Sequence, residues 1–234
     1  RSVALLKQME QAVCACLIER DEEVKAMLRC LVANEHMLLV GPPGTAKSLL
    51  CSSLCQSIGG AEYVEELMHK YTEPESLYGP VRVSGLKNDR YDRNVDGFIP
   101  TAHIAFLDEF WKASPAIINT LLKIMQERRY RNGSTVMQCN LRIMVAASNE
   151  WPQGDELGAA FDRFLVRRIV KPVSRSGFRD LLFADLPESA VVADLKDTDL
   201  AHTKAMKIPF SDSAADAMEQ IKDELVDNGI NVGD

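Results

Sequence analysis

A phosphate-binding loop is the clearest chemical signal in the chain. A short apolar run at 37–40 leads into Gly41-Pro-Pro-Gly-Thr-Ala-Lys-Ser48, and apolar residues then recur at helical spacing from 47 to 58. At such a strand-to-helix junction, backbone N–H groups and the helix dipole converge on one point and favour a phosphate. Lys47 adds a mobile positive charge, and Ser48 adds a hydroxyl ligand for Mg²⁺. The residues expected to contact a nucleotide are Gly41, Pro42, Pro43, Gly44, Thr45, Ala46, Lys47, Ser48 and Leu49.

One position departs from the P-loop pattern. The strict motif has glycine immediately before the lysine, where this chain has Ala46. Because alanine adds only a methyl group, we expect a helical backbone at this position to tolerate it. The strand, loop and helix together then predict nucleotide binding in preference to an ordinary glycine turn.

Two carboxylates follow a second predicted strand. The apolar run at 104–107 ends in Asp108 and Glu109. In P-loop enzymes a first carboxylate of this kind serves Mg²⁺, and a second orients the attacking water. Acidic pairs after strands are common, so this pair predicts hydrolysis only jointly with the upstream loop. On that basis Ser48 and Asp108 are the expected metal ligands, and Glu109 is the expected catalytic carboxylate.

Two further polar groups could complete such a site. Asn149 follows the apolar run at 141–147, and its amide could hold the lytic water or contact the γ-phosphate. Arg163 lies among aromatic residues, with Arg167 and Arg168 close behind it. Taken alone, an asparagine after a strand often caps a turn, and an arginine beside aromatic rings often forms an ion pair or a stack. These residues therefore remain candidates until a second observation supports them.

The elements that position these groups follow from the apolar periodicity. Strands alternate with helical patterns, which predicts a parallel α/β sheet covered by helices on both faces. Five strands are expected at 37–40, 61–67, 104–107, 141–147 and 164–170.

Other segments carry weaker or more local signals. Asp21 is expected to cap the second of two N-terminal helices, Asn132-Gly133 predicts a hairpin, and 79–100 is expected to form an inserted hairpin or loop. The pattern changes near Ser174 to short helices separated by polar stretches. The chain thus divides into an αβα core at 1–172 and a small helical region at 173–234.

Composition limits the class of protein. The 234 residues are 46% hydrophobic and 26% charged, with a net charge of -7. No apolar run approaches the roughly 18 residues that span a membrane, so membrane insertion is not expected. The acidic balance, without a long basic block, argues against nucleic-acid binding. Six cysteines without a CxxC pair are expected to be buried thiols of a cytoplasmic protein. The chain begins at Arg1 without an initiator methionine, so we expect it to be a fragment.

Six segments share their pattern with one known family. They are the P-loop, Phe106-Leu-Asp-Glu-Phe-Trp-Lys-Ala, Ile118-Asn-Thr-Leu-Leu, Gln126-Glu-Arg-Arg-Tyr-Arg-Asn-Gly, Val145-Ala-Ala-Ser-Asn-Glu and Phe161-Asp-Arg-Phe. This set resembles the MoxR family of AAA+ ATPases, most closely the regulatory ATPase variant A (RavA) branch, and covers residues of about 10–170. The family commonly carries the alanine before the lysine.

The resemblance implies a role for each site residue. It makes 41–48 the Walker A loop, Asp108 and Glu109 the Walker B pair, and Asn149 sensor 1 of a site for ATP and Mg²⁺. It makes Arg163 the arginine finger, with Arg167 and Arg168 as competing candidates. The nucleotide base would meet the turn near 18–20.

The resemblance also implies an assembly and a partner. It predicts an AAA+ core with a partial helical lid, assembled as a homo-hexamer that hydrolyses ATP between subunits. The output would be chaperone-like remodelling of a protein partner, often one with a von Willebrand factor A domain. Such lids supply a sensor 2 arginine, but no arginine follows Arg179 here. The lid is therefore expected to stop short of that residue.

Two other classes of function stay open from the residues. A P-loop phosphotransferase acting on a small molecule would explain the loop but would leave Asn149 and the hairpin without a role. A nucleotide-gated scaffold that does not hydrolyse would need no catalytic carboxylate, and the presence of Glu109 argues against it.

Overall fold

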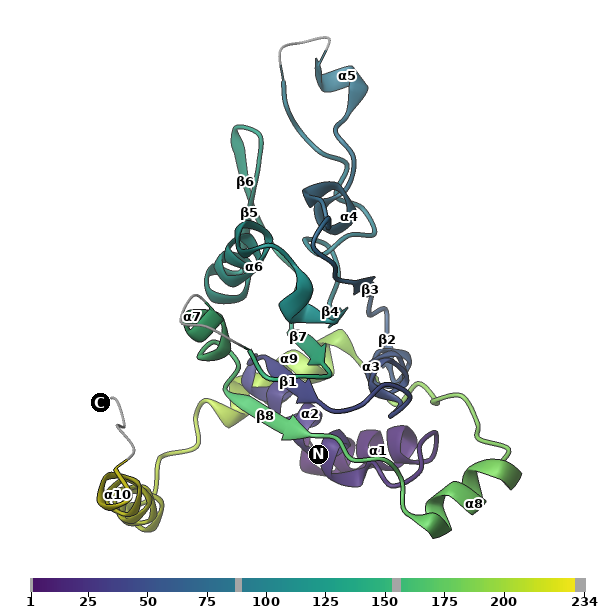
Figure 1. Cartoon of the computed structure of the whole chain (residues 1–234), viewed down its shortest axis with the longest axis vertical. Coiled ribbons are helices and arrows are strands. Elements are labelled where there is room, and N and C mark those ends of the chain that lie inside the picture. The colour runs from purple at the N-terminus through teal and green to yellow at the C-terminus, as the bar shows by residue number, and fades with distance from the viewer. Residues whose placement is uncertain (1, 87–89, 153–156, 230–234) are drawn as a thin grey trace.

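A five-stranded parallel sheet forms the centre of the molecule (Figure 1). The computed structural model describes residues 2–86, 90–152 and 157–229. The sheet order is β3-β4-β7-β1-β8, and every neighbouring pair is parallel. The strands are β1 (Met37–Val40), β3 (Tyr63–Leu67), β4 (Ile104–Asp108), β7 (Ile143–Ser148) and β8 (Val166–Ile169). The predicted five-stranded parallel α/β fold is confirmed.

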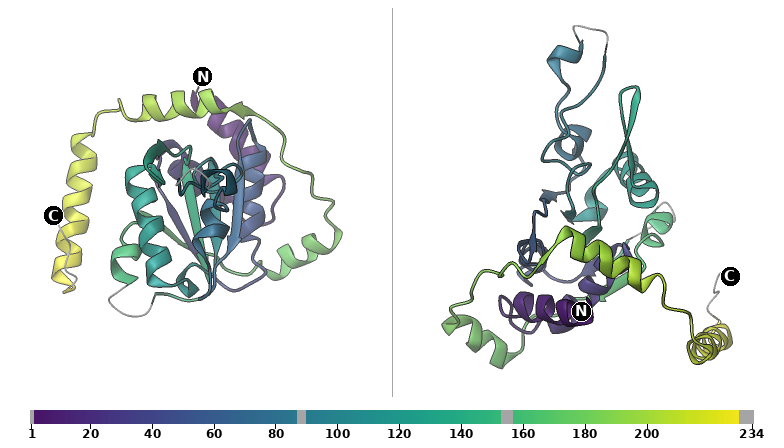
Figure 2. Two further views of the ribbon diagram at one scale, coloured as in Figure 1. Left: turned by 90° about the horizontal axis from the view of Figure 1, so that it is seen from above. Right: turned by 180° about the vertical axis from the view of Figure 1, so that it is seen from behind.

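Helices cover both faces of this sheet (Figure 2). Successive strand residues point to opposite faces, so Phe106 joins one buried cluster while Leu107 joins the other. The first face carries α1 (Ser2–Cys14), α2 (Asp21–Ala33) and α3 (Lys47–Gln56). The second carries the 3₁₀ turn η1 (Phe110–Lys112), α6 (Pro115–Glu127) and α7 (Gly158–Phe161). All six cysteines are free thiols and five are buried, as expected.

The helix starts agree only in part with the sequence. Ser114 caps α6 as a serine before proline should, because its hydroxyl accepts a hydrogen bond from the Ile117 N–H. Asp21, in contrast, is the first residue of α2 and not its cap, so that expectation is wrong. Arg20 occupies the cap position and makes no capping hydrogen bond. Its side chain is instead directed to the P-loop.

Two extensions project together from one end of the sheet (Figures 1 and 2). One is the predicted hairpin, formed by β5 (Arg129–Asn132) and β6 (Thr135–Gln138). The other contains α4 (Pro74–Tyr78) and α5 (Val83–Leu86). Within the described part of 79–100, an isolated antiparallel bridge between Val81 and Arg93 joins the two arms of the expected inserted hairpin or loop, and α5 adds a helical turn that was not predicted.

The chain after β8 is spread over the surface of the core. It forms α8 (Arg175–Phe183), β9 (Ala193–Asp194), α9 (Leu195–Ala205) and α10 (Asp212–Asp227). β9 pairs with β2 (Ile58–Gly59), and α9 packs on α1 and α2. α10 has no buried residue and lies to the side of the core (Figure 1). Among the helices of the described residues, none combines the length and apolar character needed to traverse a lipid bilayer.

Candidate functional site

The P-loop is anchored at the carboxyl ends of three adjacent strands. It follows β1, and the N–H of Gly41 donates to the Ser148 carbonyl of β7 at 2.9 Å. A Cβ on Gly41 would lie 2.2 Å from the Val170 carbonyl oxygen, just after β8. Only glycine fits between these two strands without moving the backbone. The start of the loop is therefore fixed by the sheet.

The backbone at Ala46 is not helical. Its φ is 61° and its ψ is 29°, which is the left-handed region. The expectation that a helical φ accommodates this alanine is therefore wrong. An L-residue in this region costs about 1–2 kcal/mol, a cost that glycine avoids. Ala46 thus stores backbone strain directly before the first residue of α3.

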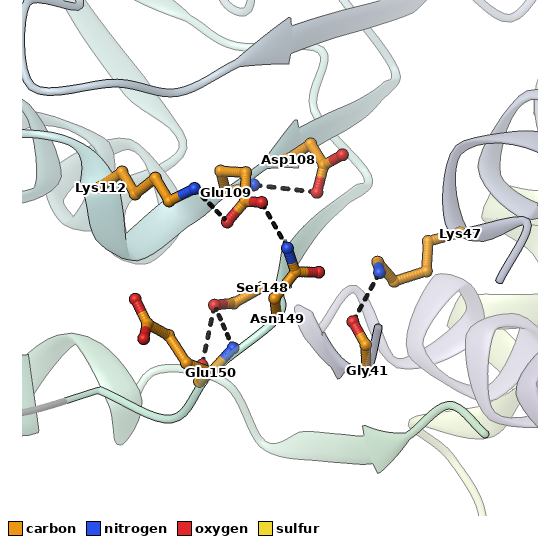
Figure 3. A network of polar contacts seen from close by, with 8 residues as sticks. All are labelled: Gly41, Lys47, Asp108, Glu109, Lys112, Ser148, Asn149 and Glu150. Atoms are coloured by element: carbon orange, nitrogen blue, oxygen red, sulfur yellow. Dashed lines mark hydrogen bonds and ion pairs between the residues drawn. The ribbon is translucent and has the colours of Figure 1, made fainter. Parts of the chain in front are cut away.

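Lys47 places a nearly buried positive charge inside the loop. Its Nζ donates to the carbonyl oxygen of Gly41 at 2.8 Å (Figure 3). It also donates to the Pro42 carbonyl at 3.0 Å, and the residue is 7% exposed. Burial lowers the pKa of Lys47, while the charges of Asp108 and Glu109 oppose that shift. The ammonium group thus has neutral partners in the loop and two carboxylates near enough to act on it.

The Asp108–Glu109 pair turns sharply at the end of β4. The Asp108 carboxylate accepts a hydrogen bond from the Glu109 N–H at 2.9 Å. Glu109 has a left-handed backbone with φ 52°. Its Oε1 accepts from Nδ2 of Asn149 at 2.6 Å, and its Oε2 lies 3.3 Å from Nζ of Lys112 (Figure 3). Both oxygens of this carboxylate are therefore held by named side chains.

Asn149 comes to this carboxylate from the neighbouring strand. β7 lies between β1 and β4, so its end brings Asn149 between the P-loop and Glu109. The buried Ser148 hydroxyl donates to the Glu150 carbonyl at 2.8 Å and accepts from the Glu150 N–H at 3.1 Å. This local turn presents the Asn149 amide to Glu109. Lys47, Asp108, Glu109 and Asn149 thus meet at one edge of the sheet, and Ser48 is half-buried in the first turn of α3.

Within the described residues, none of the three candidate arginines forms a hydrogen bond or ion pair with the polar side chains gathered at this edge. Arg163 is exposed, and its Nη2 is 3.3 Å from Oε1 of Gln126 on α6. Arg167 stacks over the Phe161 ring at 3.8 Å and donates to the Phe161 and Phe164 carbonyls. Arg168 is in register with Leu39 of β1 and lines a groove together with Arg20 at the start of α2. α7, beside Arg163, lies well away from α3 in Figure 1.

Arg20 is a loop-supporting residue that the sequence did not reveal. It is 5% exposed, its Nε donates to the Thr45 carbonyl of the P-loop at 3.1 Å, and its Nη2 donates to the Lys171 carbonyl at 3.0 Å. One planar guanidinium therefore ties the P-loop to the segment after β8. A single arginine before an acidic helix start carries no sequence signal for this role.

Glu19 extends the same connection to α8. Its carboxylate accepts hydrogen bonds from the Ser174 N–H at 2.6 Å and from the Ser174 hydroxyl. These bonds lower the pKa of Glu19. A Cβ on Gly177 would lie 2.6 Å from this carboxylate, so a larger residue there would displace the Glu19 side chain. The Glu19–Arg20 turn therefore touches both the P-loop and the first helix after the sheet.

Comparison with known proteins assigns the chain to a family. A family model described as the MoxR domain in the MoxR-vWA-beta-propeller ternary systems matches residues 4–206. The chain belongs to the MoxR family of AAA+ ATPases. The match spans the P-loop, both carboxylates and Asn149, and it includes Arg20 and Glu19.

Relatives of this MoxR-family chain are longer proteins. An uncharacterised protein of Methanocaldococcus jannaschii is 37% identical over 234 residues, with 98% of this chain and 62% of that protein covered. The chaperone MoxR1 of Mycobacterium tuberculosis is 24% identical over 175 residues, covering 71% of this chain and 44% of that protein. The crystal structure of a candidate ATPase from Cytophaga hutchinsonii superposes with a TM-score of 0.75 at 18% identity, covering 96% of this chain and 69% of that one. The chain therefore spans under two thirds of the length of the first two of these relatives.

Proposed function

We propose that this MoxR-family chain binds ATP with Mg²⁺ and hydrolyses it to remodel a partner protein. The observation that carries the proposal is the edge of the sheet where the nearly buried Lys47 ammonium lies beside Asp108, Glu109 and Asn149. A phosphate chain placed there meets a positive charge, metal-binding oxygens and a group that can orient water.

The donor set at this edge fits Mg²⁺. Ser48 offers a hydroxyl and Asp108 a carboxylate, and both are the hard oxygen ligands that this ion prefers. The Asp108 carboxylate is engaged by the Glu109 N–H of its own turn, which leaves acceptor capacity on its oxygens. When bound, the ion would neutralise charge on the phosphates.

The loop would hold the phosphates through its amides and Lys47. The Lys47 ammonium donates to two carbonyls of the loop, and these are weaker partners than an anionic phosphate oxygen. We therefore infer that Lys47 exchanges the Gly41 and Pro42 carbonyls for phosphate oxygens on binding. The anchored Gly41 keeps the loop in place while the side chain moves.

Glu109 would orient the water that attacks the γ-phosphate. Its Oε1 is occupied by the Asn149 amide and its Oε2 faces the Lys112 ammonium. Each oxygen keeps acceptor capacity beyond this one contact, so the carboxylate can also accept a hydrogen bond and then a proton from water. Asn149 can exchange its hydrogen bond to Glu109 for another partner, because its amide can bind the same water or a phosphate oxygen.

Arg163 is our proposed arginine finger, acting on a neighbouring subunit. It is exposed, its Nη2 is 3.3 Å from Gln126, and it lines a hollow with His36, which precedes β1 at the end of that strand opposite the P-loop. Arg167 is engaged by local carbonyls and a ring, so it is less free to move. An arginine finger supplies about 10³–10⁵ in rate, which would make the isolated subunit nearly inactive. Hydrolysis between subunits requires an oligomer, and we propose the homo-hexameric ring that the family resemblance implies.

The partner is proposed to be a protein. The matched family model describes systems that pair a MoxR domain with a von Willebrand factor A domain and a β-propeller, and one relative is named a chaperone. A von Willebrand factor A domain protein is accordingly our proposed partner, in the cytoplasm. The sequence motifs support a place near the RavA branch within the family.

Turnover as a function of protein concentration tests the mechanism. We expect phosphate release per subunit to rise with concentration, and to collapse in Lys47→Ala, Glu109→Gln and Arg163→Ala. Arg175→Gln, on the exposed start of α8, is the matched control that should change nothing. If turnover does not depend on protein concentration and Arg163→Ala has no effect, hydrolysis between subunits is contradicted.

Nucleotide binding is tested separately by thermal unfolding. At a free ATP concentration about 100 times Kd, binding should add about 2.7 kcal/mol to the free energy of unfolding. Absence of any shift contradicts the P-loop assignment. Binding without phosphate release supports the non-hydrolysing scaffold, and transfer of the phosphate to a small molecule supports the phosphotransferase.

A further inference from the structure

A groove runs between the two extensions at the far end of the sheet. It has a volume of about 860 Å³ and is lined by residues of 90–93 on one side and by the β5–β6 hairpin on the other. A second hollow of about 300 Å³ adjoins it, because Arg93, Tyr130 and Arg131 line both. This composite groove, called the tip groove below, is separate from the nucleotide site.

The tip groove is basic in an acidic protein. Its lining residues include five basic side chains and one acidic side chain, Asp92. The basic ones are Arg90, Arg93, Lys123, Arg129 and Arg131. The groove therefore carries +4 while the remainder of the chain carries -11. Such segregation of charge attracts anionic groups to this end of the molecule and repels them elsewhere.

Most of this positive charge is not neutralised locally. Within the described ranges, Arg90, Arg129 and Arg131 are exposed and no carboxylate lies within ion-pair distance of their guanidinium groups. Asp92, the single acidic lining residue, is 3.8 Å from Nε of Arg82. The guanidinium groups are thus available for bidentate pairing with carboxylates.

The smaller hollow supplies an apolar end. The rings of Tyr78 and Tyr130 stack with centroids 5.0 Å apart, and Ile124 of α6 completes this part of the lining. The half-buried Tyr130 ring, backed by the buried Tyr78 and Ile124, lies beside exposed guanidinium groups, and this arrangement suits a ligand with both apolar and acidic side chains.

Direct hydrogen bonds fix the shape of the groove. The Asn132 side chain accepts from the Arg93 N–H at 2.7 Å and donates to the Arg93 carbonyl at 3.0 Å. The guanidinium of Arg93 donates to the Gly79 carbonyl at 2.7 Å. The hairpin and the α4–α5 extension are thereby joined across the groove, which favours binding without a large ordering cost.

We propose that the tip groove binds an acidic polypeptide segment that carries an apolar anchor residue. Carboxylates would pair with Arg90 and Arg131, and the anchor would rest against Tyr130. A nucleic acid fits less well, because a long phosphate chain leaving the groove would run over a surface of net charge -11. The inference rests on the proposed function, since it names the chemistry of the partner that ATP hydrolysis would act upon.

Fluorescence anisotropy with a defined probe tests this inference. The probe is a short labelled peptide rich in Glu with interspersed Leu and Phe, and its comparison is the same peptide with Gln for Glu. We expect Arg90→Gln with Arg131→Gln to weaken binding of the acidic peptide at least tenfold. The control, Arg175→Gln with Arg179→Gln, makes the same change of charge on exposed α8 residues and should leave binding unchanged.

The outcomes separate this inference from the proposed function. Equal weakening by both double variants, or equal binding of the Gln peptide, would overturn a specific acidic groove. Tighter binding of an oligothymidylate of matched length through the same arginines would make the groove a nucleic-acid interface. The ATP-dependent thermal shift is measured on every variant. If the unmodified chain shows no ATP-dependent shift, the nucleotide site is contradicted. If it shows the shift but does not bind the acidic peptide, only the groove is contradicted.

Discussion

The side-chain amide nitrogen of Asn149 lies 2.6 Å from Oε1 of Glu109, and the two residues directly follow adjacent strands of the sheet. The contact fixes the orientation of the amide, because only its NH₂ group can donate to a carboxylate. A ligand that binds one of these two groups will therefore also affect the other.

Substitution of Asn149 should therefore depend on charge as well as on size. Asn149→Ala removes the donor, and we expect turnover to fall by about 10²-fold. Asn149→Asp keeps the shape but places a second carboxylate against Glu109, so turnover should fall at least another tenfold through repulsion. Steady-state phosphate release measures both. Equal turnover of the two variants contradicts an electrostatic coupling between these side chains.

The left-handed backbone at Ala46 predicts a stabilising substitution. Ala46→Gly removes about 1–2 kcal/mol of strain and adds about 0.4–1 kcal/mol of chain entropy to the unfolded state. We expect a net gain of about 0.5–1 kcal/mol, or about 1–4 °C in Tm. Ala116→Gly, at an exposed helical position in α6, is the control and should destabilise. A loss of stability in Ala46→Gly would show that the alanine is unstrained.

The buried guanidinium of Arg20 should matter to stability and to nucleotide binding together. Arg20→Met leaves the carbonyls of Thr45 and Lys171 without their charged donor, at a cost of about 2–4 kcal/mol. Arg20→Lys keeps the charge but cannot span both carbonyls, so it should recover less than half of that loss. Chemical denaturation and ATP affinity are measured on each. Full recovery of stability and ATP affinity in Arg20→Lys would contradict a role for the planar guanidinium group.

Glu19 should affect α8 without affecting the P-loop. Glu19→Gln weakens the bonds to Ser174, so amide hydrogen exchange in 174–183 should accelerate while ATP affinity stays unchanged. Glu22→Gln is the matched control, because Glu22 is an exposed neighbour paired with Lys25 at 2.9 Å. Unchanged exchange in Glu19→Gln, or equal acceleration in the control, would count against the link.

The sequence predicted the sheet and the polar edge because both follow from local patterns. Buried strands read as short apolar runs, and parallel strands bring their carboxyl ends to one edge, so Lys47, Asp108 and Asn149 could be placed together without coordinates. The Asn132-Gly133 hairpin was visible for the same reason.

Features that depend on distant partners could not be predicted in this way. The conformation of Ala46 is imposed by a loop anchored between two strands, and the burial of Arg20 depends on carbonyls 25 and 151 residues away in the chain. The tip groove depends on contacts between 93 and 132, which lie 39 residues apart. Periodicity reports which face is buried, but it does not report which segments meet there.

His36 predicts a pH dependence of stability that is independent of the nucleotide site. The residue is 3% exposed, its Nδ1 accepts from the Met144 N–H at 3.0 Å, and its Nε2 lies 3.1 Å from the Met125 carbonyl, to which it donates. This pattern requires the neutral ring. Burial, with a smaller effect of Arg128, lowers the pKa of His36 to about 3.

The sign of this effect follows from the protons bound in each state. Between the folded pKa of about 3 and the ordinary value of 6.5, the unfolded chain takes up a proton on His36 that the folded chain does not. The contribution of His36 to the free energy of unfolding is therefore fully present above the ordinary pKa. It declines as the pH falls, by about 2 kcal/mol from pH 7 to pH 5. The glutamine of His36→Gln can donate and accept hydrogen bonds but does not titrate. The free energy of unfolding of this variant, measured by denaturation at each pH, should therefore lose this part of its pH dependence. The same slope in both proteins would show that His36 is not the group responsible.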